Sequence, residues 1–222
     1  MVILVTGATG GLGPAVVKAF LDSGAAAVFG VTRSWDGRSL PEGNFHPIEA
    51  DLTTVEGCRH AAARARPVDA LVHVMGGFAG GMPVGETTDD VWNRMMDLNL
   101  RSAFYMMREV LPSMLEAGSG RIIAVGSRTG VEPAANLSAY AVSKAALHTL
   151  IRTVALEVAG SGVTANAVLP GVIDTPANRR AMPRGDHTKW VKPEAIAEVL
   201  VWLASSEAAG VNGALIPVYG RS

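Results

Sequence analysis

Tyr140 and Lys144 stand four residues apart in the stretch "SAYAVSKAAL" (138–147), whose alanines and leucine otherwise favour a helix. Side chains at positions i and i+4 of a helix lie one above the other, so the phenol and the ammonium can converge on one point. A positive charge about 4 Å from a phenolate would stabilise it by roughly 4 kcal/mol, or about three pKa units. The pair predicts a tyrosine tuned for proton transfer near neutral pH, and two solvated surface residues are the plainer alternative.

A glycine-rich turn near the N-terminus could hold a phosphate group. "VTGATGGLGPAV" (5–16) follows the first predicted strand and opens a helix, with Pro14 suited to the first helical turn because its missing N–H would have no partner there. Glycines at 7, 11 and 13 let the backbone turn tightly and approach a pyrophosphate, which the helix N-terminus attracts. The turn predicts dinucleotide binding, against the alternative of a purely structural turn.

The end of the second predicted strand bears on which dinucleotide is bound. It reads "VTRS", with Thr32 and Arg33 where a protein that binds NAD through its ribose hydroxyls usually carries an acidic residue. A guanidinium can donate two hydrogen bonds to a 2'-phosphate, so Arg33 favours NADP(H) over NAD(H), unless the side chain only points to solvent. Asp51, after the third strand, could accept from an adenine edge or cap the next helix.

These residues are spaced along alternating strand and helix patterns, and Ser127 closes the fifth strand. Short apolar runs alternate with longer amphipathic ones, a rhythm typical of a parallel sheet covered on both faces. We predict one α/β domain over 1–222, a doubly wound seven-stranded sheet, with 175–192 as a loop over the substrate. The predicted strands are 2–6, 27–32, 44–50, 70–74, 121–126, 163–169 and 214–218, and the predicted helices are 14–22, 53–65, 88–117, 138–159 and 193–205.

Composition narrows the classes of function. The 222 residues are 49% hydrophobic with a net charge of -1, which suits a large buried core and argues against nucleic acid as a partner. Cys58 is the single cysteine, so neither an intramolecular disulfide nor a metal-ligand cluster is expected. Uncharged apolar runs of membrane-spanning length are lacking, and "MVILV" is too short for a secretory signal. We expect an intracellular, cytoplasmic protein without a membrane partner.

Together these motifs resemble the short-chain dehydrogenase/reductase family, and the likeness runs from "TGATGGLG" to "NGALIPV". The family's Thr-Gly-x-x-x-Gly-x-Gly and Tyr-x-x-x-Lys patterns are both present, and its active-site serine matches Ser127. Its helical asparagine matches Asn99, and its Pro-Gly turn matches Pro170 and Gly171. The resemblance implies a Rossmann-type fold and transfer of hydride between a nicotinamide cofactor and a small carbonyl/alcohol substrate.

The resemblance also implies a role for each matched residue. Tyr140 would be the general acid/base, and Lys144 would bind the nicotinamide ribose and lower the tyrosine pKa. Ser127 would polarise the substrate carbonyl, and Asn99 would hold a water in a proton relay. The implied cofactor-binding positions are Thr6, Gly7, Thr9, Gly11, Leu12, Gly13, Arg33, Asp51, Leu52, Gly76, Tyr140, Lys144, Pro170, Gly171 and Thr175.

The chain departs from the family pattern at two places. After the fourth strand it reads "HVMGG" (73–77) instead of Asn-Asn-Ala-Gly, although Gly76 and Gly77 still allow a close backbone approach. His73 is interpreted as a strand-end histidine with local partners. Gly10 stands where NADP-preferring relatives often have a basic residue, which leaves Arg33 as the evident ligand for a 2'-phosphate.

Two loop stretches bear on the substrate. "VMGGFAGG" (74–81) and "DTPANRRAMP" (174–183) are similar to the dihydropteridine reductase branch of the family, so reduction of quinonoid dihydropterin is the alternative activity. Phe78, Met182 and Trp190 could form an apolar wall for a ring, or could only pack the loop. Basic residues at 179, 180, 184 and 189 keep a 3-oxoacyl carrier as an outside alternative, and a non-catalytic nucleotide sensor is another.

The long helices also predict self-association. Helices 88–117 and 138–159 carry more apolar residues than one core-facing stripe needs, among them Met95, Met96, Met106, Met107 and Leu150. These residues leave a face for a partner subunit, and the family resemblance implies a homodimer or homotetramer through such helices.

Overall fold

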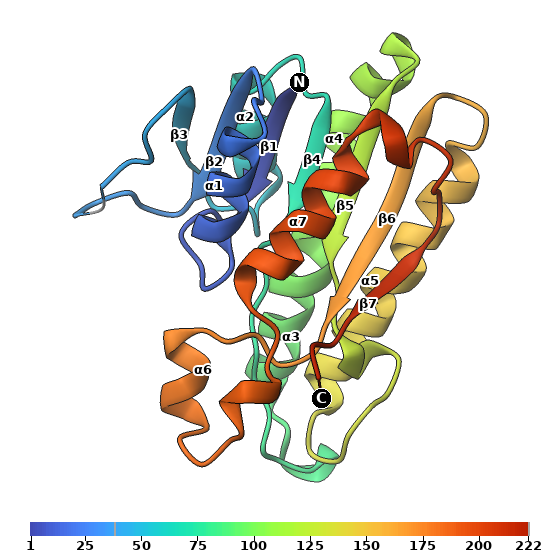
Figure 1. The fold of residues 1–222 in the computed structure, drawn as a ribbon. Helices are drawn as coiled ribbons and strands as arrows, with labels where there is room; N and C mark the ends of the chain where they lie inside the picture. Colours follow the sequence, from blue (N-terminus) through green and yellow to red (C-terminus); the bar gives the residue numbers. More distant parts are fainter. Residues whose placement is uncertain (38, 222) are drawn as a thin grey trace.

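Seven parallel strands form one sheet in the computed structural model, which describes residues 1–37 and 39–221 (Figure 1). Their order across the sheet is β3-β2-β1-β4-β5-β6-β7, so β1 lies between β2 and β4, with Ile3 opposite both Val28 and Ala70. The strands are β1 (Val2–Thr6), β2 (Ala27–Thr32), β3 (Phe45–Glu49), β4 (Ala70–His73), β5 (Gly120–Val125), β6 (Val163–Pro170) and β7 (Leu215–Val218).

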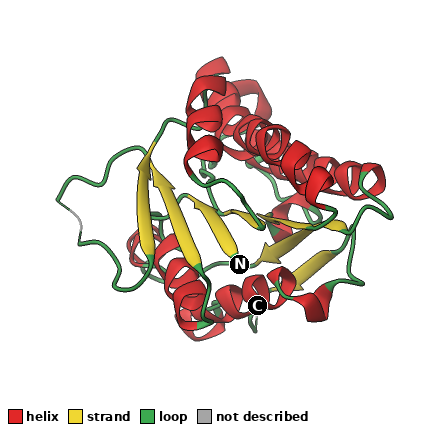
Figure 2. Ribbon diagram, turned by 90° about the horizontal axis from the view of Figure 1, so that it is seen from above, coloured by secondary structure: helices red, strands yellow, loops and turns green. Residues whose placement is uncertain are grey.

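Helices cover both faces of this sheet (Figure 2). The helices α1 (Gly13–Asp22) and α7 (Pro193–Ala204) pack together on one face, and α2 (Val55–Arg64), α4 (Ser102–Ala117) and α5 (Ser138–Glu157) lie on the other. Alternate residues of a strand point to opposite faces, so Ile3 and Val5 enter one buried cluster while Leu4 enters the other. The predicted doubly wound fold is confirmed.

The predicted helix at 88–117 is one continuous element with a change of winding inside it. It comprises α3 (Asp89–Met96), a π-helical turn η2 (Asp97–Arg101) that contains Asn99, and α4. The hydroxyl of Thr88 accepts from the Val91 N–H and starts the element. A π-helical turn inside a helix often marks a functional site, which directs attention to Asn99.

The 175–192 segment differs from the predicted loop because it contains a short helix, α6 (Pro176–Ala181), and a single 3-10 turn, η4 (His187–Lys189). The Thr175 hydroxyl accepts from the Asn178 N–H at 3.2 Å, and Pro176 occupies the first helical turn, where its missing N–H costs nothing. In Figure 1, α6 lies at the end of the molecule toward which the strand arrows point.

The methionines expected to leave a face for a partner subunit are mostly in the core. Met95, Met106 and Met107 are buried, whereas Met96 and Leu150 are half-buried. Helices α4 and α5 instead expose four other large apolar residues, Phe104, Leu115, Val142 and Leu156. In the described part of the chain, no helix is both long enough and apolar enough to cross a bilayer.

Candidate active site

Tyr140 and Ser127 meet at the carboxyl edge of the sheet. Ser127 lies two residues beyond the end of β5, and Tyr140 lies in the first turn of α5. The Ser127 hydroxyl accepts from the Thr129 N–H at 3.2 Å, and it lies beside the phenol of Tyr140 and acts to lower its pKa. Burial raises the pKa of Tyr140 above its ordinary value of 10.0, and the interaction with Ser127 opposes that rise. The phenol is therefore protonated at neutral pH, as a proton donor must be.

Lys144 is buried one helical turn after Tyr140, with 5% of its surface exposed. Its Nζ donates to the carbonyl oxygen of Val125 at 2.9 Å, and burial lowers its pKa to about 8. The sequence had suggested that the ammonium would lower the tyrosine pKa, but the Tyr140 pKa is raised. The reason is that burial penalises the charged form of both groups, and the ammonium turns to the end of β5 for its hydrogen bond.

Asn99 is fully buried in the π-helical turn, and its amide is held from two sides. Its Oδ1 accepts from the Gly77 N–H at 2.8 Å, while its Nδ2 donates to the Gly77 carbonyl at 3.0 Å and to the Ser143 hydroxyl at 3.0 Å. The Ser143 hydroxyl donates in turn to the Tyr140 carbonyl at 2.8 Å. Asn99 thus ties the loop after β4 to the turn of α5 that carries the phenol.

Ser143 is a site residue that the sequence reasoning missed. It is a buried hydroxyl between Tyr140 and Lys144, and the signal was available as a polar residue within an otherwise apolar helical run. Its partner Asn99 is 44 residues away in sequence, so the pairing itself could not be predicted.

The glycines after β4 are required by close packing. A Cβ at position 76 would lie 2.8 Å from Asn99 Oδ1 and 3.2 Å from Lys144 Nζ, so only glycine lets both side chains approach.

His73, at the end of β4, is buried between Thr6 Oγ1 at 3.1 Å and Ser102 Oγ at 3.3 Å. The interpretation of His73 as a locally bonded histidine is confirmed.

The glycine-rich turn after β1 has the close backbone packing that a pyrophosphate cradle needs. Gly7 has a φ of +67°, and a Cβ there would lie 2.9 Å from the Met75 backbone. A Cβ on Gly13 would lie 2.3 Å from the Gly7 carbonyl oxygen, and one on Gly11 would lie 3.1 Å from Thr175 Cγ2. The turn therefore presents bare backbone at the N-terminus of α1, the geometry that suits a dinucleotide phosphate.

Other predicted cofactor positions are internal. Thr6 Oγ1 is occupied by His73 and by the Met75 N–H at 3.2 Å, and Leu12 and Leu52 are core residues. Thr9 Oγ1 lies 2.7 Å from Thr32 Oγ1, which joins the turn to the end of β2. The remaining positions follow β6. Pro170 ends that strand, the Gly171 N–H donates to the Val218 carbonyl at 3.2 Å, and Thr175 is buried at the start of α6.

A cavity of about 650 Å³ extends from the loop after β4 to the ends of β2 and β3. Its lining includes Arg33, Asp51, Met75 and Arg94, so both predicted adenosine-side residues face one space. Asp51 does not cap α2, because Thr54 does; its carboxylate accepts from the Thr53 N–H and hydroxyl at 2.9 and 2.7 Å. These bonds, and more weakly Arg33, lower the pKa of Asp51. Arg94, which also lines this cavity, was not among the site residues predicted from the sequence.

A separate cavity of about 670 Å³ lies between α1 and α7. None of the predicted site residues lines it, so it has no evident connection with the chemistry. The described residues also contain no group of three or more His, Cys, Asp or Glu side chains arranged to hold a metal ion.

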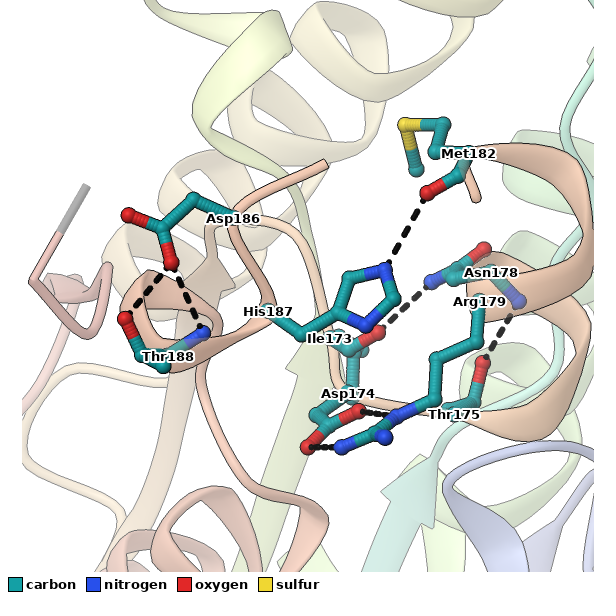
Figure 3. Close-up of polar contacts among 9 residues, drawn as sticks. All are labelled: Ile173, Asp174, Thr175, Asn178, Arg179, Met182, Asp186, His187 and Thr188. Atoms are coloured by element: carbon teal, nitrogen blue, oxygen red, sulfur yellow. Dashed lines mark hydrogen bonds and ion pairs between the residues drawn. The ribbon is translucent and has the colours of Figure 1, made fainter. Parts of the chain in front are cut away.

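The 175–192 segment is held by polar contacts within itself and to the two residues just before it, Ile173 and Asp174 (Figure 3). Arg179 donates to both oxygens of Asp174 at 2.6 and 2.8 Å, which neutralises one of the basic residues expected to attract an anion. His187 Nε2 lies 3.1 Å from the Met182 carbonyl, and the His187 ring packs against Trp190 with centroids 4.3 Å apart. Trp190 is therefore part of the internal packing of this segment.

Phe78 and Met182 are the exposed apolar residues among those predicted to contact substrate. Phe78 is 62% exposed, yet its ring lies edge to face with Tyr140 at a centroid distance of 5.0 Å. Met182 is 40% exposed at the end of α6. Phe78 thus places an apolar surface directly beside the phenol.

Residues 1–184 match the family model described as short chain dehydrogenase. The short chain dehydrogenase adrF of Penicillium rubens is 32% identical over 98% of this chain and 95% of that protein. The cis-4-hydroxycyclohexanecarboxylate dehydrogenase of Sinomonas cyclohexanicum is 33% identical over 99% of this chain and 95% of that protein. A solved structure of a putative NAD(P) dependent gluconate 5-dehydrogenase from Beutenbergia cavernae, with bound NADP, is 31% identical to this chain. The match covers 98% of this chain and 94% of that chain, with a TM-score of 0.88.

Proposed function

The chain belongs to the short-chain dehydrogenase family and is an NAD(P)-dependent oxidoreductase, and we propose that it uses NADP(H) to interconvert a small carbonyl compound and its alcohol. The observation that carries this proposal is the placement of Ser127 beside a protonated, half-buried Tyr140 at the carboxyl edge of the sheet, where the serine hydroxyl acts to lower the pKa of the phenol. Two hydroxyls that meet there can both bind one carbonyl oxygen and supply its proton.

The chain's own residues handle the proton and the substrate oxygen. Because the Ser127 Oγ already accepts from the Thr129 N–H, its own proton is available to be donated to the substrate oxygen. Tyr140 delivers its phenolic proton to that oxygen during reduction and takes one back during alcohol oxidation. Asn99 and Ser143 hold the backbone around Tyr140 and so fix the phenol's position.

The cofactor fits the other half of the site. The bare turn at Gly7, Gly11 and Gly13 would hold its pyrophosphate, and Lys144, one helical turn from the phenol, is proposed to bind the nicotinamide ribose. When bound, NADP(H) supplies or accepts the hydride. Arg33 lines the adenosine-side cavity and supports the preference for NADP(H), because a guanidinium binds a 2'-phosphate through charge-assisted hydrogen bonds. The 31% identical Beutenbergia cavernae structure, which contains NADP, also supports it.

The exposed Phe78 supports a substrate with an apolar group next to the reacting carbon. An apolar or cyclic group could pack on that ring while its oxygen reaches Tyr140. The Sinomonas cyclohexanicum relative is named for a hydroxy acid with a six-membered carbocycle. The 175–192 segment is proposed to cover the substrate, with Met182 as part of its apolar side.

We also propose that the protein is a homodimer or homotetramer through α4 and α5. Four large apolar residues on these helices, Phe104, Leu115, Val142 and Leu156, are 43–79% exposed. Burying them against a second copy would remove that apolar surface from water. Sedimentation at low protein concentration tests this, and a monomer would contradict it.

The proposed function is tested by the rate of NADPH oxidation, and separately of NADH oxidation, with a panel of small ketones and aldehydes. Quinonoid dihydropterin and 3-oxoacyl thioesters are measured under the same conditions. We expect turnover with carbonyl compounds and a higher kcat/KM for NADPH. Fast reduction restricted to dihydropterin would replace the proposed substrate class, and cofactor binding without any turnover would reject catalysis.

A further inference from the structure

His148 is a buried titratable residue that the proposed chemistry does not use. It lies in α5 one turn beyond Lys144, and 4% of its surface is exposed. Its ring reaches back from the helix to the loop after β5, where Ser127 is located.

The contact between His148 and Ser127 has a defined direction. The Ser127 backbone N–H donates to His148 Nε2 at 3.3 Å. Because a backbone N–H can only donate, Nε2 must carry a lone pair, and the proton of the neutral ring must be on Nδ1. Burial, and secondarily the charge of Lys144, lowers the pKa of His148 to about 4, so the ring is neutral at pH 7.

Glycines on both sides of Ser127 make room for this ring. A Cβ on Gly126 would lie 2.3 Å from His148 Nε2, and one on Gly130 would lie 2.5 Å from His148 Cε1. The two glycines and the imidazole therefore fill one packed space beneath Ser127. Any change in the ring position would be transmitted to the backbone of residues 126–130.

The other bonds of this loop leave the Ser127 N–H to His148. The Gly126 N–H donates to the Val168 carbonyl at 2.8 Å, and the Gly130 N–H donates to the Ser127 carbonyl at 3.1 Å. The Thr129 N–H donates to Ser127 Oγ at 3.2 Å. His148 is thus the acceptor that holds the serine's own amide, two bonds from the Cβ that carries the hydroxyl.

We propose that His148 is a positioning residue that sets the orientation of the Ser127 hydroxyl by accepting a hydrogen bond from the Ser127 backbone. This inference rests on the proposed catalytic role of Ser127. His148 touches neither the substrate nor the phenol in this role; it acts through the serine.

The first test is spectroscopic and independent of activity. Nitrogen NMR of the free protein should show His148 with a protonated Nδ1 and an unprotonated Nε2 at pH 7. The Ser127 amide should exchange with deuterium slowly in the wild type and in His148→Gln, whose amide oxygen can take the place of Nε2. Exchange should be at least about tenfold faster in His148→Met, which has similar length and only a weak acceptor. A protonated Nε2, or equal exchange in the two variants, would overturn the proposal.

The second test separates this inference from the proposed function by a double-mutant cycle in kcat. His148→Met should lower kcat by about tenfold to a hundredfold, and His148→Gln should restore it to within about threefold of wild type, with NADPH affinity little changed in either. In a Ser127→Ala background, His148→Met should lower kcat by less than about threefold. An equal loss in both backgrounds would overturn the positioning role, whereas an inactive wild type or a fully active Ser127→Ala enzyme would instead overturn the proposed function.

A comparison of two amides covers the case in which His148→Met does not fold. Asn at position 148 places its amide near the Nδ1 position, one carbon short of the Ser127 N–H, whereas Gln reaches it. Slow amide exchange and high kcat in His148→Gln, with both lost in His148→Asn, would support the proposal. Identical behaviour of the two variants would contradict it.

Discussion

The Lys144 ammonium donates to the carbonyl oxygen of Val125 at 2.9 Å, at the end of β5. This contact holds the charge inside the protein, where burial lowers the lysine pKa to about 8. The neighbouring Tyr140 is also governed by burial, in the direction that raises its pKa. The two residues that share a helix face therefore both shift toward their neutral forms.

The first prediction concerns the ionisation of Tyr140. Because burial raises its pKa above the ordinary 10.0, the free enzyme should carry a neutral phenol throughout pH 6 to about 10. Absorbance at the phenolate band, taken as the difference between wild type and Tyr140→Phe, measures this group among the three tyrosines. Its midpoint should lie above 10. A midpoint near 7 would mean that Lys144 controls the phenol after all.

A second prediction tests the packing of Gly76 between Asn99 and Lys144. Gly76→Ala would place a Cβ 2.8 Å from Asn99 Oδ1, so the amide must move and the loop after β4 must shift. We expect a loss of about 1–3 kcal/mol in the free energy of unfolding and a large fall in kcat. Gly210→Ala is the matched control, since a Cβ there would meet nothing within 4 Å. Equal urea midpoints for the two variants would contradict the packing.

A third prediction concerns Arg33 and the cofactor. Arg33→Ala should weaken NADPH binding roughly tenfold to a hundredfold, the value of a lost charge-assisted hydrogen-bond set, and leave NADH binding nearly unchanged. Quenching of protein fluorescence by each cofactor measures both constants. Arg64→Ala, in the last turn of α2 and outside the cavity lining, should change neither. A parallel loss of affinity for both cofactors would show that Arg33 does not recognise the 2'-phosphate.

The fourth prediction concerns stability in mild acid. The pKa values of His73 and His148 are lowered to about 3 and about 4, against an ordinary 6.5. Below pH 6.5 the unfolded chain therefore takes up protons that the folded protein does not, and the free energy of unfolding falls. Each histidine should contribute a loss of about 2 kcal/mol between pH 7 and pH 5. Well above pH 6.5 both histidines are neutral in the folded and in the unfolded chain, so neither changes the free energy of unfolding with pH.

Urea unfolding at pH 7 and pH 5 checks this, because most carboxylates remain ionised over that range. His148→Gln should remove about half of the acid-induced loss. A variant that loses as much stability as the wild type would show that His148 does not stay neutral in the folded state.

The sequence predicted the sheet well because its strands are short apolar runs. β1 and β2 begin and end at the predicted residues, since buried parallel strands read as continuous β-branched stretches bounded by turn residues. The short helix α6 was missed because it depends on Thr175, Pro176 and the Asp174–Arg179 pair more than on periodicity. Six residues are too few for a 3.6-residue pattern to stand out.

Within the site, residue types could be predicted, but their environments could not. The spacing of Tyr140 and Lys144 put both on one helix face, yet the direction of the tyrosine's pKa shift depends on burial beneath Phe78 and neighbouring segments. The bonds of Asn99 to Gly77 and Ser143, and the contact of His148 with Ser127, join segments 21 or more residues apart in sequence. Only the folded chain brings these groups together.

The central claim is that Tyr140 transfers the proton during NADP(H)-dependent turnover. The most direct measurement is the single-turnover rate of carbonyl reduction by wild type and Tyr140→Phe, on the best substrate of the panel, beside the NADPH affinity of each. We predict that the variant binds NADPH within about threefold of wild type and reacts about 10²–10⁴-fold more slowly, the contribution expected of a general acid. A variant that reacts at nearly the wild-type rate would contradict the claim.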